Sequence, residues 1–479
     1  MGGNLPKNWI ETNLETIIER MSNGSGLKQF EEPFENSFPI SRIETIWNET
    51  IDLDRVKYVN PTKTDIEKYS FLKGDVLFSH INSDKHLGKT AVFNLDTVLI
   101  HGINLLLLRA QPQFNGYLLN YFLRYYRLTG KFIEVAQRSV NQSSINQKKL
   151  NTFKIPLPPL AEQNRIVAKL DRLFAQLEIL KTSMAKVPLL LKDFRQQVLT
   201  RAVTGKLTEE WRKDKKMKNW EEFTLSELII EKPRNGYSPQ AVGYETEVKS
   251  LSLSAITSGV FNPAYVKYLD IESPSKNSHL WLKNGDILIQ RSNSLEYVGT
   301  SAIYDGEDFE FIYPDIMIKI RANFKISTNY LNYCLSSFKT REYFRNNATG
   351  TAGNMPKINQ VVVMNTTINL PSDLEQEEIE VRVESLFAKA DAIEQQYKSL
   401  KAKIDKLPQA ILHKAFKGEL SEQLDTDGDA RELLKQIQEL KGINKKAIKN
   451  PKLEKLKNFN KKLKNYPEGD DFLRMVAEK

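Results

Sequence analysis

Apolar residues recur at spacings of four and three along two long stretches of the chain. The runs include Ile166, Leu170, Leu173, Leu177 and Leu180 in the first stretch and Ile379, Val383, Leu386, Ile393 and Leu400 in the second. This spacing lasts for more than four heptads, which is typical of a coiled-coil seam, whereas a helix on a globular core drifts toward a period of 3.6. The pattern predicts two long helices that pair through these residues, with an ordinary core helix as the alternative. Pro188 and Pro408 lie inside the runs and are expected to kink or interrupt them.

Shorter patterns precede each long run. Segments rich in β-branched and large apolar residues, bounded by Gly, Asn and Asp, predict strands, and two longer segments have helical periodicity. The predicted strands are 74–81, 89–95, 103–110, 285–292, 300–306 and 315–322, and the predicted helices are 115–130 and 327–344. A polar loop follows each helix, at 136–147 and 346–360. A mixed α/β head is therefore expected before each long helix.

The two halves of the chain repeat one another. The triplet Lys-Asn-Trp occurs at 7–9 and 218–220, Ile-Asn-Gln at 145–147 and 358–360, and the offset between such landmarks stays between 211 and 213. A repeat of this length indicates domain duplication rather than a solenoid. The predicted organisation is a head at 1–157, a spacer helix at 158–206, a second head at 213–371, a second spacer helix at 372–419 and a helical, Lys-rich tail at 420–479.

Symmetry sets the expected arrangement of the two halves. Paired identical units are usually related by a twofold axis, and such an axis through the helices makes them antiparallel. The predicted fold class is α/β, with two similar mixed α/β domains separated by a long antiparallel two-helix coiled coil and related by an internal pseudo-twofold repeat. Each seam covers about 48 Å, which corresponds to about 14 base pairs of DNA. The proline-rich run from Pro156 to Pro159 is extended and stiff, and it fixes how the first head leads into its helix.

Charge favours an anionic partner. The formal net charge is +9 and the pI is near 9.1, which favours nucleic acid over a membrane surface because no basic amphipathic anchor opens the chain. The single Cys334 excludes an internal disulfide framework, and no signal peptide or membrane-spanning apolar run is present. We expect a cytoplasmic protein with no membrane partner. Residues 441–464 hold ten Lys and one Glu, which predicts a solvated or disordered tail, with phosphate contact or return of the chain toward the first head as the alternative.

Each candidate catalytic motif lacks a residue that its chemistry requires. The Gly-Lys-Thr at 88–90 lacks the upstream glycine of a P-loop, and the second copy has Gly-Thr-Ser at 299–301, so a repeated turn is expected. Ala264 replaces the second proline of an adenine methyltransferase motif at 261–265, and Met317 stands where a nuclease metal ligand would follow Asp315. The five histidines show no metal-ligand spacing. The sequence predicts recognition without chemistry.

Two repeated segments carry a family resemblance. Segments 155–180 and 368–393 share Leu-Pro, Glu-Gln and Leu-Phe-Ala, and they are followed by the related segments 205–211 and 418–424. Over roughly residues 1–440 the chain resembles the specificity subunit of type I DNA restriction-modification enzymes. One departure is Ser372-Asp373 in the second copy, where the first has Pro159-Leu160.

The resemblance implies a function. Each head would be a target-recognition domain that reads one half of an asymmetric bipartite site in double-stranded DNA. The helices would space the heads and hold two modification subunits, which carry adenine N6-methyltransferase activity with S-adenosylmethionine. Restriction subunits would add ATP- and magnesium-dependent cleavage, and this chain would bind no cofactor and have no enzymatic activity. The alternative is a duplicated scaffold whose heads bind protein. A self-sufficient methylase fusion is disfavoured because no segment has room for a cofactor domain.

Three polar loops at equivalent places in both copies are the expected base readers: 22–26 and 234–239, 79–86 and 290–297, and the long loops 136–147 and 346–360. Asn, Gln and Arg can bond base edges, whereas Ser, Thr and Lys mostly hold phosphates. The candidate DNA-binding residues are Asn23, Ser25, His80, Asn82, Ser83, Lys85, Arg138, Asn141, Gln142 and Ser144 in the first head and Arg234, Asn235, Tyr237, Gln290, Arg291, Asn293, Ser294, Thr351, Asn354 and Lys357 in the second. Arg291 is the strongest single candidate for a guanine contact. The alternative for each residue is that Asn, Gly and Ser only form turns.

Overall fold

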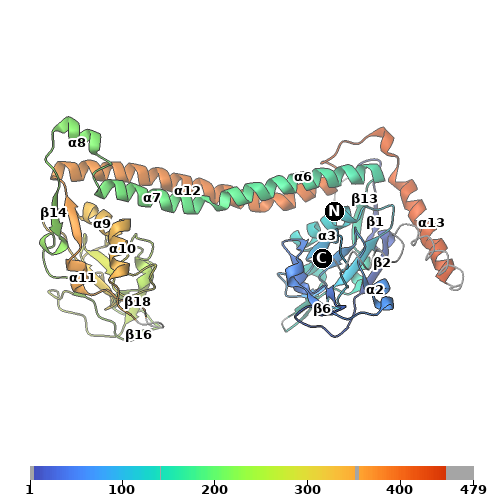
Figure 1. The fold of residues 1–479 in the computed structure, drawn as a ribbon, viewed down its shortest axis with the longest axis horizontal. Coiled ribbons are helices and arrows are strands. Elements are labelled where there is room, and N and C mark those ends of the chain that lie inside the picture. Colours follow the sequence, from blue (N-terminus) through green and yellow to red (C-terminus); the bar gives the residue numbers. More distant parts are fainter. Residues whose placement is uncertain (1–4, 141, 351–354, 449–479) are drawn as a thin grey trace. The chain divides into compact units, whose positions relative to one another are not determined.

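Residues 5–140, 142–350 and 355–448 are described by the computed structural model (Figure 1). The chain divides into two compact units. Unit 1 combines the residues up to Lys181 with those from Ala402 onward, and unit 2 is Thr182–Lys401. Each unit contains one head and segments of the long helices.

A four-stranded antiparallel sheet forms the centre of head 1, in the order β2-β10-β7-β9. The buried runs β7 (Val76–Phe78) and β10 (Leu106–Ala110) lie in the middle, as expected for strands with few polar residues. Helix α3 (Gly116–Leu128) packs on this sheet. The other elements of unit 1 before the long helix are β1 Ile10–Asn13, α1 Leu14–Ile17, β2 Ile18–Asn23, β3 Phe38–Ile40, η1 Ile43–Thr45, β4 Ile46–Trp47, β5 Thr50–Ile51, η2 Leu53–Arg55, β6 Lys57–Val59, α2 Lys63–Tyr69, β8 Ile81–Asn82, β9 Thr90–Val92, α4 Lys131–Val135, β11 Gln137–Ser139, β12 Gln142–Ser144, α5 Gln147–Asn151 and β13 Lys154–Leu157.

Head 2 repeats this sheet with the order β15-β22-β19-β20 and adds a second four-stranded sheet, β16-β18-β17-β21. The predicted helix 327–344 is wrong in one respect, because it consists of α9 (Thr328–Ser336) and α10 (Phe338–Asn346). Ser337 has extended backbone and caps α10, which ends one helix and starts the next. The other elements are α8 Glu209–Lys215, β14 Glu221–Thr224, η3 Leu225–Glu227, β15 Arg234–Asn235, β16 Ala241–Val242, β17 Val248–Leu251, η4 Leu253–Ala255, β18 Val266–Leu269, β19 Ile287–Gln290, β20 Ser301–Ile303, β21 Phe311–Ile312, β22 Met317–Ile320, α11 Gln360–Met364 and β23 Thr367–Leu370.

The long helices are α6 (Leu160–Ala185), α7 (Val187–Val203) and α12 (Asp373–Phe416). In unit 2, Arg195 pairs with Asp391 and Glu394, while Val198 and Ala202 share a buried cluster with Ile379 and Val383. Positions that rise along α7 therefore meet positions that fall along α12, so the two helices run antiparallel within this unit.

In unit 1, helix α3 contacts both α6 and the end of α12. Tyr121 stacks on Phe174 of α6 at 5.4 Å between ring centroids, and Phe122 meets Phe416 of α12 at 5.0 Å. Helix α6 leaves the head here and α12 returns to it (Figure 1). After α12 come η5 (Asp425–Asp427) and α13 (Ala430–Ile448), and the backbone of Ala430 bonds to Asn8. Unit 1 is thus built from both ends of the chain.

The two prolines behave differently. Pro188 lies in the first turn of α7, and the helix breaks between Ala185 and Val187, so the predicted interruption is confirmed there. Pro408 does not interrupt α12, which continues to Phe416. A proline removes a single backbone donor, and Pro408 is buried in a helix that is otherwise continuous.

A buried Glu-Gln pair at each head–helix junction explains why the segment recurs. Glu375 accepts hydrogen bonds from Thr208 Oγ1 at 2.6 Å and from Trp220 Nε1 and Arg212 Nε, both at 2.9 Å. In unit 1, Glu162 accepts from Trp9 Nε1 and from Ser421 Oγ, both at 2.7 Å, and from Gln423. We call each set a junction clamp, because one carboxylate joins the start of a head to the segment that follows the opposite long helix.

The glutamine beside each carboxylate holds the head's helix. Gln163 accepts from the backbone N–H of Asn115, which caps α3, and donates to the carbonyl of Pro158. Gln376 repeats both bonds with Ser327, which caps α9, and with Pro371. The Pro-Glu-Gln segment is therefore the point at which strand, helix cap and long helix are fixed together.

Candidate nucleic-acid interface

Three polar loops converge in head 1. Strand β8, in the loop 79–86, pairs with β12, in the loop 136–147, and Ile145 N–H donates to the carbonyl of His80 at 2.9 Å. Gln147 Nε2 donates to Asn23 Oδ1 at 3.0 Å, which joins the loop 22–26 to the same surface. In order, we call 22–26, 79–86 and 136–147 the first, second and third loops of head 1.

Head 2 brings its equivalent loops together in the same way. Its first, second and third loops are 234–239, 290–297 and 346–360. Ile358 N–H donates to the carbonyl of Arg291 at 2.9 Å, and Gln360 Nε2 donates to Asn235 Oδ1 at 3.3 Å. The sequence predicted three equivalent loops in each copy, and the structure places them side by side in each head.

The repeated triplet Ile-Asn-Gln makes the hydrogen bonds that join the loops in each head. Ile145 and Ile358 are buried, at 1% exposure each, and fix the loop to the core. Asn146 and Asn359 cap the short helices α5 and α11. The glutamines make the bonds to the first loop. From the sequence, this triplet was interpreted only as a landmark of the duplication. Its recurrence was the signal from which its role in holding the loops could have been predicted.

Asparagines hold the second loops from within. Asn82 donates to Ser79 Oγ at 3.1 Å and accepts from Ser83 N–H at 2.9 Å. Asn293 donates to Gln290 Oε1 at 2.8 Å and accepts from Ser294 N–H at 2.7 Å. Gly88 and Gly299 close these turns with φ of +74° and +76°, so the expectation of a repeated turn at these glycines is confirmed.

Several predicted DNA contacts are buried framework residues. Gln290 is 0% exposed, and its amide nitrogen donates to Leu253 O and Thr257 Oγ1. Ser25 and His80 are 2% and 7% exposed. Burial lowers the pKa of His80, so its imidazole is neutral at pH 7 and carries no charge toward a phosphate. We correct the prediction for these three residues, because their side chains face the core. Asn141, Thr351 and Asn354 lie outside the described residues.

The remaining described candidates have side chains that are at least partly exposed to solvent. In head 1, Ser83, Lys85 and Arg138 are exposed, and Arg138 lies 3.7 Å from Asp84. In head 2, the exposed residues are Arg234, Tyr237, Ser294 and Lys357. Asn23 and Gln142 are exposed, whereas Ser144, Asn235 and Arg291 are partly buried. Arg291 Nη1 lies 3.3 Å from the carbonyl of Asp315, which leaves most of its guanidinium donors available.

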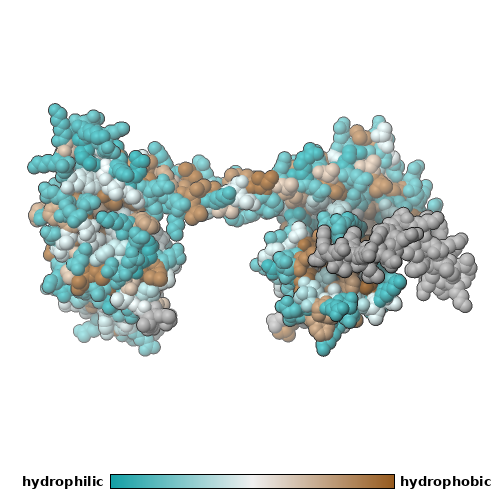
Figure 2. Space-filling view, in the orientation of Figure 1, coloured by the Kyte–Doolittle hydropathy of each residue, from teal (hydrophilic) through white to brown (hydrophobic). Residues whose placement is uncertain are grey.

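The long helices present an apolar surface of their own. Of the predicted seam, Ile166, Leu170, Leu177, Ile379 and Val383 are buried, and Leu173 and Leu386 are half-buried. In unit 2, Phe194, Ile393 and Leu400 are 37–49% exposed, and we call these three residues the exposed row. In unit 1, Leu180 and Leu407 are 41% and 38% exposed. Figure 2 shows apolar side chains at the surface of these helices. The predicted seam is therefore only partly sealed by helix pairing within the units, since a pair of helices covers one side of each helix.

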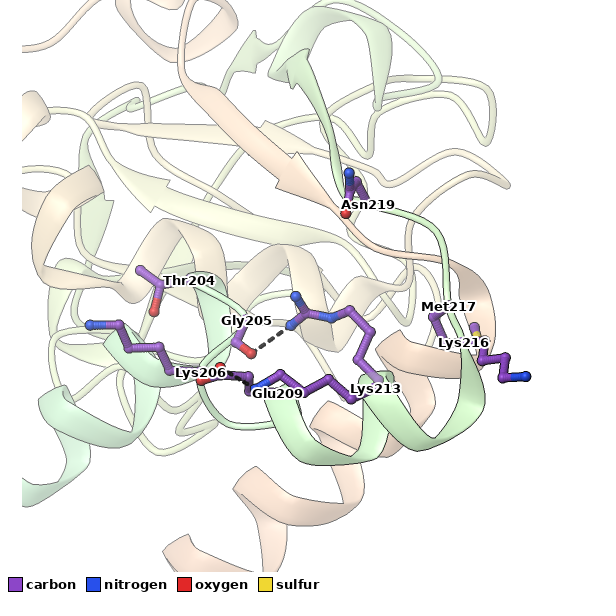
Figure 3. Close-up of a pocket in the computed structure, with 9 residues that line it drawn as sticks. Thr204, Gly205, Lys206, Glu209, Lys213, Lys216, Met217 and Asn219 are labelled. Carbon is purple, nitrogen blue, oxygen red and sulfur yellow. Dashed lines mark hydrogen bonds and ion pairs between the residues drawn. The ribbon is translucent and has the colours of Figure 1, made fainter.

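A cavity of about 360 Å³ lies between the end of α7 and α8 (Figure 3). Arg212 Nη2 donates to the carbonyl of Gly205 at 2.5 Å, and Lys213 pairs with Glu209 at 2.8 Å, so these cations are already paired within the protein. Among the described residues, no group of His, Cys, Asp and Glu is arranged to hold a metal ion. Within the same residues, no helix is long and apolar enough to cross a membrane.

Comparison with known proteins identifies related chains. A family model described as "Type I restriction modification DNA specificity domain" matches residues 6–189 and again 217–402. The chain is 30% identical over 427 residues to the type I restriction enzyme EcoKI specificity subunit of Escherichia coli, covering 88% of this chain and 91% of that one. It is 29% identical over 429 residues to the StySPI specificity subunit of Salmonella potsdam, with the same coverage of 88% and 91%.

Two solved structures share the fold. A chain from work on complex assembly and conformational transition of the type I R-M system superposes with a TM-score of 0.63 at 18% identity, covering 87% of this chain and all of that one, 100%. The HsdS subunit from Thermoanaerobacter tengcongensis gives a TM-score of 0.54 at 18% identity, covering 87% of this chain and 99% of that one. At this identity the likeness concerns the fold alone.

Proposed function

The chain belongs to the type I restriction modification DNA specificity family, and from this premise we propose that it is the DNA-recognition subunit of a type I restriction-modification complex. Its two heads read the two parts of a bipartite, asymmetric DNA site. Its helices assemble the modification and restriction subunits. The chain itself is not an enzyme, since methyl transfer to adenine N6 and ATP-dependent cleavage belong to the partner subunits.

The observation that carries this proposal is that equivalent hydrogen bonds join the loops in both heads. Both heads join three loops through the same bonds, Gln147 to Asn23 in one head and Gln360 to Asn235 in the other. The outward side chains differ, because the exposed Lys85 in head 1 stands where head 2 has the exposed Glu296. An asymmetric bipartite site needs two readers of equal geometry and different chemistry, and this combination supports that function.

Within each head, we assign the charged outward residues to two tasks. Lys85 and Lys357 suit phosphate contact, because an ammonium is a point charge without bidentate geometry. Arg138, Arg234 and Arg291 suit guanine, since a guanidinium can donate to O6 and N7 together. The turn-forming asparagines Asn82 and Asn293 fix the second loop of each head, which holds the side chains assigned to the two tasks in place.

The exposed row of the long helices supports the assembly of modification subunits. A further helix from a partner would cover Phe194 of α7 together with Ile393 and Leu400, which lie one heptad apart on α12, as in a multi-helix coiled coil. We assign S-adenosylmethionine, ATP and magnesium to the partner subunits, where the chemistry takes place. A cytoplasmic location follows from the proposed substrate, which is DNA inside the cell.

Mapping of methylated adenines tests the proposal. The chain is co-expressed with its modification subunits in a host that lacks adenine methylation, and the same subunits without this chain serve as the control. We expect methylation at one bipartite sequence only when the chain is present. Methylation that is independent of the chain, or confined to one uninterrupted sequence, would contradict the proposal. DNA binding that weakens steeply with salt separates it from a protein-binding scaffold.

A further inference from the structure

A buried side chain lies beneath the first loop at the same position in both heads. His101 Nε2 lies 3.1 Å from the carbonyl oxygen of Ser22, and Tyr313 Oη donates to the carbonyl of Arg234 at 3.3 Å. The two buried residues are 212 positions apart, and so are the two residues whose carbonyls accept. His101 and Tyr313 are both 0% exposed. Different chemistry therefore makes the same contact in the two heads.

The main chain of each buried residue makes a second bond to the loop. Ser25 N–H donates to the carbonyl of His101 at 2.6 Å, and Tyr237 N–H donates to the carbonyl of Tyr313 at 2.9 Å. The loop passes so closely that a Cβ on Gly236 would lie 1.9 Å from the Tyr313 carbonyl oxygen. The backbone contact keeps the loop in place, and the side-chain donor fixes where the loop begins.

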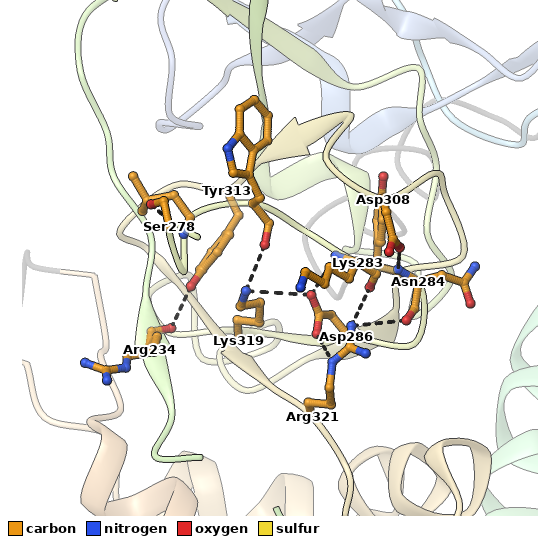
Figure 4. Close-up of polar contacts among 12 residues, drawn as sticks. Arg234, Ser278, Lys283, Asn284, Asp286, Asp308, Tyr313, Lys319 and Arg321 are labelled. Atoms are coloured by element: carbon orange, nitrogen blue, oxygen red, sulfur yellow. Dashed lines mark hydrogen bonds and ion pairs between the residues drawn. The ribbon is translucent and has the colours of Figure 1, made fainter. Parts of the chain in front are cut away.

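The ring of each residue is held against movement. His101 meets Phe71 edge to face at 5.1 Å between ring centroids. Above the Tyr313 ring, at 5.5 Å from its centroid, lies the ammonium of Lys319, which donates to the carbonyl of Trp281 at 2.9 Å and lies 3.7 Å from Asp286 (Figure 4). A fixed ring transmits its position to the carbonyl that it bonds.

That carbonyl belongs to the part of the loop that faces outward. Arg234 is exposed, and the next residue, Asn235, receives the bond from the third loop. In head 1, Ser22 precedes Asn23, which receives the equivalent bond. A shift of the anchored carbonyl would therefore move the reading side chain and its link to the third loop together.

We propose that His101 and Tyr313 are positioning residues that set the first loop of each head and, through it, the base specificity of the half-site that the head reads. This inference rests on the function proposed above. Neither residue touches DNA. Each acts through the loop that its side chain anchors, so loss of the donor affects one head and leaves the other unchanged.

The test uses the complex of this chain with its modification subunits. Tyr313→Phe and His101→Phe each keep a ring and remove the donor to the loop. The measured quantity is the methylation rate on duplexes that carry the mapped site or one base change in either half. We expect Tyr313→Phe to lower discrimination about fivefold, the equivalent of one hydrogen bond, in the half-site of head 2 alone. His101→Phe should do the same in the other half.

Two further variants separate positioning from general stability. Tyr304→Phe removes a matched buried phenol bond in head 2, to the carbonyl of Glu307 at 2.6 Å, which lies outside the three loops. It should leave discrimination unchanged. Tyr313→His supplies the ring N–H that head 1 uses at this position, and it should restore the discrimination that Tyr313→Phe loses.

The outcomes are distinct. Unchanged discrimination in both ring variants, or an equal loss in both half-sites, would overturn the positioning role while leaving the proposed function intact. An equal loss in Tyr304→Phe would overturn it too, because the effect would then be one of stability. If Tyr313→Phe does not assemble, His101→Phe decides the question in head 1. A wild-type complex without a bipartite site would overturn the proposed function and this inference with it.

Discussion

Side chains in the three loops of each head divide into those that hold the loop and those that face outward. Asn82 and Asn293 donate to other side chains of the second loops, and Gln290 donates to the carbonyl of Leu253 in η4. Lys85 and Arg234 extend into solvent. The sequence predicted the loops but could not separate these roles, because the amide that bonds a base edge is the same group that closes a turn. Only the three-dimensional contacts distinguish them.

Arg291 remains the strongest candidate for a guanine contact. Its position in the second loop of head 2 leaves donors free beyond the one near Asp315. Replacing it with alanine should relax one base position by about 1–3 kcal/mol of discrimination, while salt-sensitive binding persists. Methylation of duplexes with single base changes measures this.

Arg138→Ala is the matched control for Arg291→Ala, since it removes an exposed arginine from the third loop of head 1. Its effect should fall in the opposite half-site. Identical changes from both variants would argue against separate readers.

His101 gives head 1 a pH dependence that head 2 lacks at the equivalent position. Burial lowers the pKa of His101, the bond to Ser22 raises it, and the neighbouring Arg20 and His80 lower it, which together place the pKa at about 4. The imidazole of the unfolded chain has a pKa near 6.5, so between pH 6.5 and 4 it binds a proton that the folded chain does not bind. Stability should therefore fall as pH drops from about 6.5 toward 4, by roughly 2 kcal/mol at pH 5.

Urea unfolding at pH 7.5 and pH 5 measures this loss. His101→Phe should show a shallower decline between the two pH values, because the titrating group is gone. The decline will not vanish, since burial lowers the pKa of His80 as well. An unchanged pH dependence in the variant would assign the effect to other groups.

At the scale of elements, hydrophobic spacing was the most reliable guide. It predicted the two long helices and three of the four strands of the central sheet in each head, because a buried face imposes its period on the sequence. It did not predict the second four-stranded sheet of head 2. It could not predict that Leu180, Ile393 and Leu400 of the seam would remain exposed, since the spacing is the same whether one partner helix or several cover it. It also missed the break at Ser337, where a single capping serine ends one helix and begins another.

The junction clamp of unit 2 should be a point of weakness when altered. Glu375→Gln removes the charge that three donors converge on and leaves Arg212 without its ion pair. We expect a loss of about 3 kcal/mol in the free energy of unfolding of unit 2. Hydrogen exchange at β14 and the first turns of α12 measures it.

Glu377→Gln is the matched control for the clamp, because Glu377 lies two positions away on the same helix and is exposed. It should leave exchange rates unchanged. Equal protection in the two variants would show that the clamp contributes nothing beyond the surface charge.

Leu177 and Leu180 should separate helix pairing from partner assembly. Leu177 is 4% exposed, so Leu177→Asp buries a charge. The expected loss of unfolding free energy is no smaller than that of a large-to-small core change, which is about 2–5 kcal/mol. Leu180 is 41% exposed, so Leu180→Asp should change stability by less than about 1 kcal/mol while it weakens binding of the modification subunits. Urea unfolding and size-exclusion of the complex measure both; equal effects in the two assays would reject the separation.

At the scale of the whole molecule, the duplication gives each head its own loops, clamp and helix contacts. The clamp of unit 2 uses Thr208 from the segment after α7, and the clamp of unit 1 uses Ser421 from the segment after α12. The sequence predicted this equivalence from the related segments at 205–211 and 418–424. It did not locate the contacts by which both ends of the chain build unit 1, because these contacts join residues far apart in the sequence, such as Ser421 and Glu162, which are 259 positions apart.

Exchange of residues 213–370 for the matching head of a relative should change one half of the recognised site and leave the other half and the spacer intact. These limits keep Thr208, Arg212 and Glu375 in the host chain, so two of the three clamp bonds survive, and the third requires a tryptophan at the position of Trp220 in the incoming head. All three reading loops of head 2 travel together, which preserves the bonds among them. Specificity at separated base pairs is roughly additive, at about 1–3 kcal/mol each, so neither head needs the other to read its own bases. A methylation map of the exchanged protein decides the matter. If both halves change together, or if the spacer changes while both halves stay, the heads do not read independently.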